Sequence, residues 1–87
     1  MAEVLKLLQQ NLTLRLAVHG HTDNAGTPPH NQQLSEARAR AVVASLTGAG
    51  ITTSRLQVAG FGQTKPLADN ATEAGKAQNR RVELVKL

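Results

Sequence analysis

The 87-residue sequence contains no cysteine, tryptophan or tyrosine and has a single phenylalanine, Phe61. The lack of cysteine excludes disulfide bonds and thiolate metal sites, although it leaves the cellular compartment open. The lack of aromatic side chains argues against binding of single-stranded nucleic acid, which usually depends on stacking of bases on aromatic rings. Any core must therefore consist of leucine, valine, isoleucine and alanine.

Long apolar runs and concentrated basic runs are also missing. No segment approaches the length of a membrane span, and Glu3 and Lys6 stand where a signal peptide has its apolar stretch. We therefore expect neither a membrane span nor a signal peptide. The chain is then either a cytoplasmic protein or a piece of a longer one. The net charge of +4 is compatible with an anionic partner but does not identify that partner. The length predicts one domain over residues 1–87.

Apolar residues at helical spacing predict two helices, over residues 2–10 and 31–49. Asn31 is expected to be the N-cap of the second helix, because asparagine side chains accept hydrogen bonds from free backbone N–H groups at that position. Gly50 stands where a helix commonly ends in a left-handed residue, which predicts a Schellman motif.

Alternation of apolar and polar residues predicts a strand over residues 14–19, and two further strands are expected over 56–61 and 81–87. The segments 20–29 and 62–78 contain glycine, proline, aspartate and asparagine and are predicted as loops. A loop as long as the second is usually functional in a small domain. The expected fold class is α/β: a two-layer α+β sandwich in which a mixed β-sheet packs against two main helices.

Two arginines of the second predicted helix differ in their expected surroundings. At 100° per residue, Arg38 falls on the side that also carries Leu34, Ala37, Ala41, Val42 and Ser45. An arginine on the inward face needs a partner or a pocket, because an unpaired buried charge is very costly. Arg40 falls on the opposite side and is interpreted as a solvated surface charge.

An acid, Asp23, follows the first predicted strand, and the pair Arg80 and Arg81 opens the last one. With Arg38, Asp23 would hold a small zwitterion by both of its charges. Two simpler interpretations stay open: Asp23 caps its own turn, or Asp23 and Arg38 form a purely structural ion pair. The arginine pair can also serve as edge-strand charges; Arg80 is kept as a site candidate, whereas Arg81 is expected to be structural or peripheral.

His19, His21 and Asp23 stand at alternating positions, and two histidines with a carboxylate are a known zinc ligand set. A metal-dependent enzyme or a zinc-binding domain using these three residues is therefore an alternative. We nevertheless expect no metal and no cofactor, because no further ligand-rich motif follows. No serine has a credible base, and no pair of carboxylates is placed for glycoside cleavage, so we expect a binding module rather than an enzyme. An assembly domain without ligand binding is a further alternative.

Taken together, the motifs resemble the OmpA C-terminal-like domain, the module that anchors outer-membrane proteins and flagellar stator proteins to the cell wall. They lie in the expected order over residues 2–87, and together they are highly specific. The matching stretches are Gly20–His21–Thr22–Asp23, Asn31, Leu34–Ser35 with Arg38–Ala39, Gly50–Ile51, Arg55–Leu56, Gly60–Phe61–Gly62, Pro66 and Asn79–Arg80–Arg81–Val82.

The resemblance implies non-covalent binding of peptidoglycan through the diaminopimelate residue of its stem peptide. It also implies a place in the bacterial periplasm, as part of an envelope protein associated with the outer membrane. Asp23 matches the family aspartate that pairs with the ligand's ammonium group, and Arg38 matches the helix arginine that pairs with its carboxylate. The remaining expected ligand contacts are Asn31, Arg80, Thr22 and Asn24.

The family domain normally begins with a β-strand before its first helix, and this chain starts at that helix. Ligand binding at the site is expected to be retained without this strand, because Asp23 and Arg38 are both present. The sheet is expected to have an open edge, with Val18 and Val58 in central strands. Since an open edge is a template for pairing, we expect a second copy to close it in a homodimer.

Overall fold

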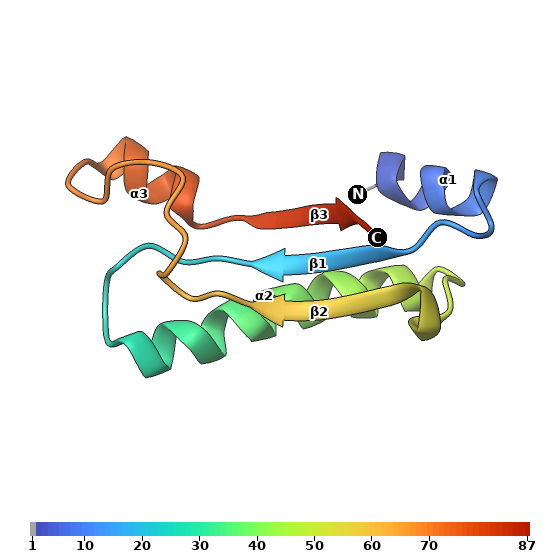
Figure 1. The fold of residues 1–87 in the computed structure, drawn as a ribbon, viewed down its shortest axis with the longest axis horizontal. Coiled ribbons are helices and arrows are strands. Elements are labelled where there is room, and N and C mark those ends of the chain that lie inside the picture. The colour runs from blue at the N-terminus through green and yellow to red at the C-terminus, as the bar shows by residue number, and fades with distance from the viewer. Residues whose placement is uncertain (1) are drawn as a thin grey trace.

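The computed structural model of the chain describes residues 2–87. Its three strands form one mixed sheet in the order β2-β1-β3, with β1 parallel to β2 and antiparallel to β3. The predicted α/β fold class is therefore confirmed. The elements in chain order are α1 (Ala2–Gln10), β1 (Leu16–Gly20), α2 (Pro28–Gly48), the 3-10 turn η1 (Thr53–Arg55), β2 (Leu56–Gly60), α3 (Glu73–Asn79) and β3 (Val82–Lys86) (Figure 1).

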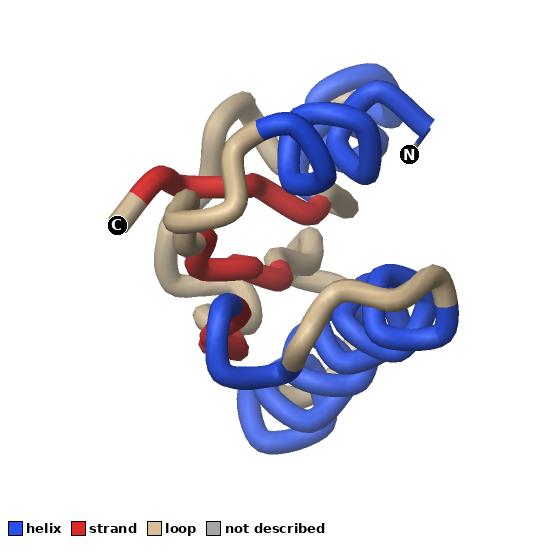
Figure 2. The backbone as a smooth tube through the Cα atoms, turned by 90° about the vertical axis from the view of Figure 1, so that its right-hand side faces the viewer, coloured by secondary structure: helices blue, strands red, loops and turns tan. Residues whose placement is uncertain are grey.

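Helices α1 and α2 lie on the same side of the sheet, as Figure 2 shows. Between them and the sheet lies an aliphatic core without aromatic residues, as the composition predicts. Full burial of each such side chain contributes about 1.5–3 kcal/mol to stability. The buried members of this core are Leu8, Leu16, Leu46, Ile51 and Leu56.

Helix α2 begins three residues before the predicted start. Thr27 is the N-cap, and its Oγ1 accepts a hydrogen bond from the backbone N–H of His30 at 3.4 Å. Pro28 and Pro29 fill the first turn, where a missing N–H has no cost and the fixed φ suits a helix. The prediction of Asn31 as N-cap is therefore wrong, because the prolines assigned to the loop 20–29 start the helix.

The other end of α2 is as predicted. Gly50 has φ +103°, the left-handed region that glycine adopts without strain. The N–H groups of Gly50 and Ile51 donate to the carbonyls of Thr47 and Leu46, both at 3.1 Å, which is the Schellman pattern. This ending turns Ile51 back into the core beside Leu46.

The inward face of α2 differs from the prediction. The helix approaches the sheet so closely that a Cβ on Gly20 would overlap the backbone carbonyl of Ser35. Small and polar residues therefore face inward near the start of the helix, and Ala37, Ala41 and Ser45 are exposed. Hydrophobicity alone does not reveal such a face. The buried residues of α2 are Asn31, Ser35, Ala39 and Leu46.

The segment predicted as the loop 62–78 contains most of helix α3. The helix is capped by Thr72, whose Oγ1 accepts a hydrogen bond from the backbone N–H of Gly75 at 2.9 Å. Gly75 is buried against the carbonyl of Asp69, which leaves no room for a Cβ. A seven-residue helix held by a cap and by close backbone packing carries no apolar stripe, so periodicity does not reveal it.

Strand β1 is central, and β2 and β3 form the two edges. Val18 is accordingly 0% exposed, but the prediction of a central strand for Val58 is wrong, because β2 is an edge strand and Val58 is 38% exposed. Within residues 2–87, β3 bonds to no strand other than β1. None of the helices in this part of the chain has the length and hydrophobicity of a membrane span.

Candidate functional site

The predicted site residues gather at one end of the sheet, where α3 and the start of α2 also lie (Figure 1). The segment after β1 is bonded to both neighbouring strands beyond their regular pairing. The N–H of His21 donates to the carbonyl of Arg81, and the N–H of Thr22 donates to the carbonyl of Gly62, both at 2.9 Å. Asp23, at the end of this segment, is thus placed by the sheet itself.

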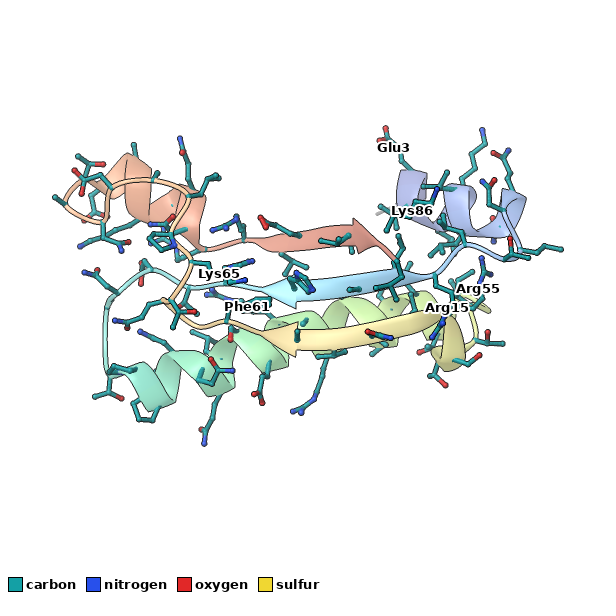
Figure 3. The ribbon with its side chains drawn as sticks, in the orientation of Figure 1. Glu3, Arg15, Arg55, Phe61, Lys65 and Lys86 are labelled. Atoms are coloured by element: carbon teal, nitrogen blue, oxygen red, sulfur yellow. The ribbon has the colours of Figure 1, made fainter. Side chains whose placement is uncertain are left out.

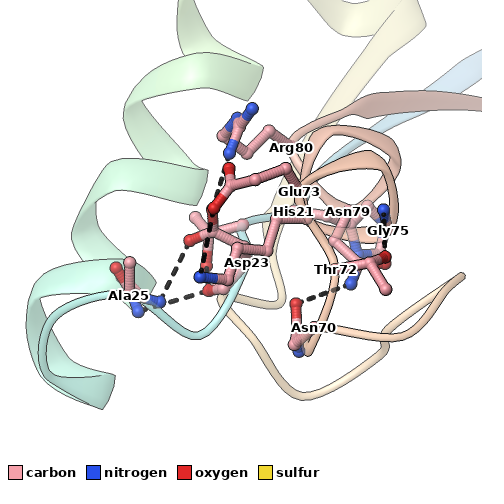
Figure 4. Close-up of polar contacts among 12 residues, drawn as sticks. His21, Asp23, Ala25, Asn70, Thr72, Glu73, Gly75, Asn79 and Arg80 are labelled. Atoms are coloured by element: carbon pink, nitrogen blue, oxygen red, sulfur yellow. Dashed lines mark hydrogen bonds and ion pairs between the residues drawn. The ribbon is translucent and has the colours of Figure 1, made fainter.

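Asp23 is 7% exposed, and both of its carboxylate oxygens have partners. Oδ1 accepts a hydrogen bond from the backbone N–H of Ala25 at 3.0 Å, and Oδ2 accepts one from Nη1 of Arg80 at 2.8 Å (Figure 4). The Ala25 N–H, and after it Arg80, holds the pKa of Asp23 below its usual value. Asp23 therefore caps its own turn and also presents an anionic group at the site.

Arg38 lies on the neighbouring helix and does not pair with Asp23. Its Nη1 donates to the backbone carbonyl of His21 at 3.1 Å, and its other N–H groups make no hydrogen bond within residues 2–87. The interpretation of Asp23 and Arg38 as a structural ion pair is therefore wrong. Both charges are held by the same short segment, residues 21–23, without neutralising each other.

Two more predicted residues hold the backbone of Asp23. Nδ2 of Asn31, which is 2% exposed, donates to the carbonyl of Asp23 at 3.4 Å and to Oε1 of Gln63 at 2.8 Å. Oγ1 of Thr22, which is 3% exposed, donates to the same Asp23 carbonyl at 2.8 Å. Asn24 is exposed in the turn that follows. The structure thus brings Asn31 and Thr22 to Asp23 as supports of its backbone.

The two arginines that precede β3 have different surroundings. The side chain of Arg80 is 43% exposed although it pairs with Asp23, so it faces both the site and solvent. The side chain of Arg81 is 17% exposed; it contacts Oε1 of Glu83 at 3.3 Å and donates to the carbonyl of Lys65 at 3.2 Å. These are the contacts expected of a structural arginine.

Sequence reasoning missed the structural role of Asn79, which is 0% exposed. Its Oδ1 accepts from the N–H groups of Leu67 and Ala68 at 2.7 and 2.9 Å. Its Nδ2 donates to the carbonyl of Ala68 at 2.9 Å and to Oδ1 of Asn70 at 2.7 Å (Figure 4). Asn79 therefore fastens the loop before α3 to the end of that helix, directly before Arg80. The family resemblance includes Asn79 in the matching stretch Asn79–Arg80–Arg81–Val82 but assigns it no role of its own.

His19, which lies in β1, and His21, which follows it, both contact Phe61 rather than Asp23. The ring of His21 stacks on Phe61 with centroids 5.4 Å apart, and His19 meets the ring edge-on at 4.8 Å. Lys65 lies over Phe61 with its Nζ 4.2 Å from the ring centroid (Figure 3). Within residues 2–87 no three His, Asp or Glu side chains gather as metal ligands, so His19, His21 and Asp23 do not form the cluster that the zinc alternative requires.

Burial, followed by the positive charge of Arg81, lowers the pKa of His21. The carboxylate of Glu83 acts in the opposite direction from 3.4 Å. Burial thus favours the neutral form of the His21 ring, and the backbone carbonyl of the same residue anchors Arg38. Its role at this end of the sheet is one of packing.

A model of the OmpA family matches residues 1–80. The chain is 45% identical over 71 residues to the outer-membrane lipoprotein YfiB of Pseudomonas aeruginosa, which covers 82% of this chain and 42% of that protein. It is 41% identical over 71 residues to the peptidoglycan-binding protein ArfA of Mycobacterium tuberculosis, covering 82% of this chain and 22% of that protein. The chain thus spans less than half the length of these relatives.

Among solved structures, the fold is similar to that of the peptidoglycan-associated lipoprotein from Burkholderia pseudomallei. The TM-score is 0.93 at 32% sequence identity, and the similarity covers 98% of this chain and 72% of that chain. The same sheet order and helix placement therefore occur in a protein whose name includes its association with peptidoglycan.

Proposed function

Because the chain belongs to the OmpA family, we propose that it binds peptidoglycan non-covalently through the diaminopimelate residue of the stem peptide. In this proposal it anchors an envelope protein to the cell wall in the bacterial periplasm. The names of ArfA and of the Burkholderia lipoprotein support the partner. The outer-membrane lipoprotein YfiB supports the location.

One observation carries the proposal: Asp23 and Arg38 are fastened to the same segment and do not pair with each other. The end of a diaminopimelate side chain carries both an ammonium and a carboxylate group. Asp23 would accept hydrogen bonds from the ammonium group, and Arg38, with N–H groups to spare, would donate to the carboxylate. A zwitterion thus meets opposite charges in a fixed arrangement.

Arg80 is the second cation of the proposed site. The Arg80 side chain is 43% exposed, whereas that of Asp23 is 10% exposed. In this proposal an ammonium group of the ligand replaces Arg80 beside Asp23, so that the buried carboxylate keeps a cationic partner and Arg80 turns toward a ligand carboxylate. Asn24 is proposed as a contact at the rim, and Thr22 as a residue that holds the carbonyl of Asp23. Asn31 is proposed to hold the same carbonyl and also to contact the ligand.

The site is proposed to bind its ligand and not to cleave it. Ser35, the buried hydroxyl nearest to the loop after β2, already donates to the carbonyl of Gln32 at 2.8 Å and accepts from the N–H of Gly62 at 2.9 Å. A hydroxyl that is used in this way to join helix and loop has no base to activate it.

The proposal is tested by isothermal titration of a diaminopimelate-containing stem peptide. Asp23→Ala and Arg38→Ala are expected to weaken binding by about 2 kcal/mol or more, roughly 30-fold, as when one partner of a desolvated charge pair is lost. Arg40→Ala is the matched control, because this side chain is 70% exposed and its ion pair, at 3.7 Å, is with Glu36 of the same helix. Intact binding in Arg38→Ala together with lost binding in Arg40→Ala would contradict the assignment.

Ligand specificity gives a second test of the same site. A stem peptide with lysine in place of diaminopimelate keeps the ammonium group but offers Arg38 no carboxylate, so it is expected to bind more weakly. Equal affinities for the two peptides would rule out recognition of diaminopimelate. Stable folding without affinity for either peptide would favour an assembly domain.

We also propose that two copies pair through the outer edge of β3. In residues 2–87 this strand is bonded to β1 alone, and a row of free backbone groups favours the addition of a further strand. Symmetric pairing closes the β3 edge of both copies at once. Light scattering over a concentration series is expected to show a dimer, and a well-folded monomer at every concentration would refute the proposal.

A further inference from the structure

We propose that Gln63 is a positioning residue that stabilises the orientation of the Asn31 amide set by the carbonyl of Asp23, and with it the atom of Asn31 that a ligand meets. This inference rests on the proposed function of the same site. Gln63 follows β2 and is half-buried, and its side chain reaches Asn31 on helix α2 from 32 positions further along the chain. It lies outside the motifs that predicted the site.

The orientation of the Asn31 amide follows from its neighbours. The carbonyl oxygen of Asp23 can only accept a hydrogen bond, so the atom of Asn31 that faces it at 3.4 Å must be the nitrogen Nδ2. This nitrogen also lies 2.8 Å from Gln63, and the facing atom of Gln63 must then be its oxygen Oε1. Both N–H groups of Asn31 are thus used within the protein.

The remaining polar atom of Asn31 is Oδ1, which accepts no hydrogen bond within residues 2–87. It faces the turn after Asp23, where a Cβ placed on Gly26 would lie 3.7 Å from it. Asn31 can therefore offer a ligand only an acceptor. Its partner must be an ammonium or amide N–H group and not a carboxylate, so Asn31 and Asp23 serve the same, cationic end of the ligand.

Gln63 maintains this polarity because it gives Nδ2 of Asn31 a second acceptor. Without that acceptor, a single hydrogen bond of 3.4 Å holds the Asn31 amide, so its side chain leaves this orientation more readily. Gln63→Glu keeps the acceptor oxygen, whereas Gln63→Met keeps the approximate length of the side chain and removes the acceptor. The pair of variants separates the hydrogen bond from the packing.

The experiment combines titration and NMR on the full chain. The two ligands are the diaminopimelate stem peptide and an analogue in which the side-chain ammonium group is replaced by hydrogen. In Gln63→Met the preference for the ammonium-bearing peptide is expected to fall about fivefold, the effect of roughly one hydrogen bond, and the side-chain amide signals of Asn31 are expected to shift. Gln63→Glu is expected to preserve that preference.

Gln33→Met is the matched control, because Gln33 is an exposed residue of α2, and it should change neither readout. An unchanged preference and unchanged Asn31 signals in Gln63→Met would overturn the inference. If the wild-type chain bound neither ligand, the proposed function would fail and the ligand preference assigned to Asn31 would fail with it. The Asn31 signals would still decide, separately, whether Gln63 orients the amide.

Discussion

Replacing Asn79 with alanine is expected to destabilise the fold by about 2–3 kcal/mol. The side chain makes four hydrogen bonds of 2.7–2.9 Å at 0% exposure, and each contributes about 1 kcal/mol net. The full sum is not expected, because Leu67 is 64% exposed and neighbouring loop groups can regain water once the asparagine is gone. The loss is nevertheless large against the usual total stability of about 5–15 kcal/mol.

Thermal denaturation followed by circular dichroism measures this effect. For a domain of this size, a loss of 1 kcal/mol lowers Tm by about 4–8 °C, so a fall of roughly 10–20 °C is expected. Asn70→Ala is the control, because it removes one of the four hydrogen bonds and should lower Tm by a few degrees only. If Asn79→Ala melted with the wild type, or if the two variants lost equal stability, the fastening role of Asn79 would be refuted.

Other predictions concern packing and pH. Gly20→Ala is expected to abolish folding, because the new Cβ would overlap the carbonyl of Ser35; a native-like melting curve would contradict this. Stability in urea is expected to fall as the pH drops below about 6.5, since burial lowers the pKa of His21 and the unfolded chain takes up the proton first; His21→Phe should remove this fall. A second fall is expected below about pH 3.8, because hydrogen bonds lower the pKa of Asp23. Asp23→Asn should not show this second fall in stability. If the variant lost stability at low pH as the wild type does, the assignment to Asp23 would be contradicted.

Much of the fold was accessible from the sequence because local patterns determine it. Alternation predicted the first strand, the two further strands were expected where they occur, and Gly50 predicted the Schellman ending of α2, which the hydrogen bond of Ile51 confirms. The N-terminus of α2 was misplaced because prolines stand both in loops and in first helical turns. Helix α3 was missed because caps and close backbone packing stabilise it, and neither gives an apolar period.

The sequence by itself determined the chemistry at this end of the sheet: one acid after β1, an inward arginine on α2 and an arginine pair before β3. Only the tertiary structure decided which of these groups meet. Arg80, 57 positions away, pairs with Asp23, whereas Arg38 binds the carbonyl of His21. The reason is that β3 runs antiparallel to β1, so its beginning lies beside the end of β1, and a contact set by strand pairing leaves no periodic trace in the chain.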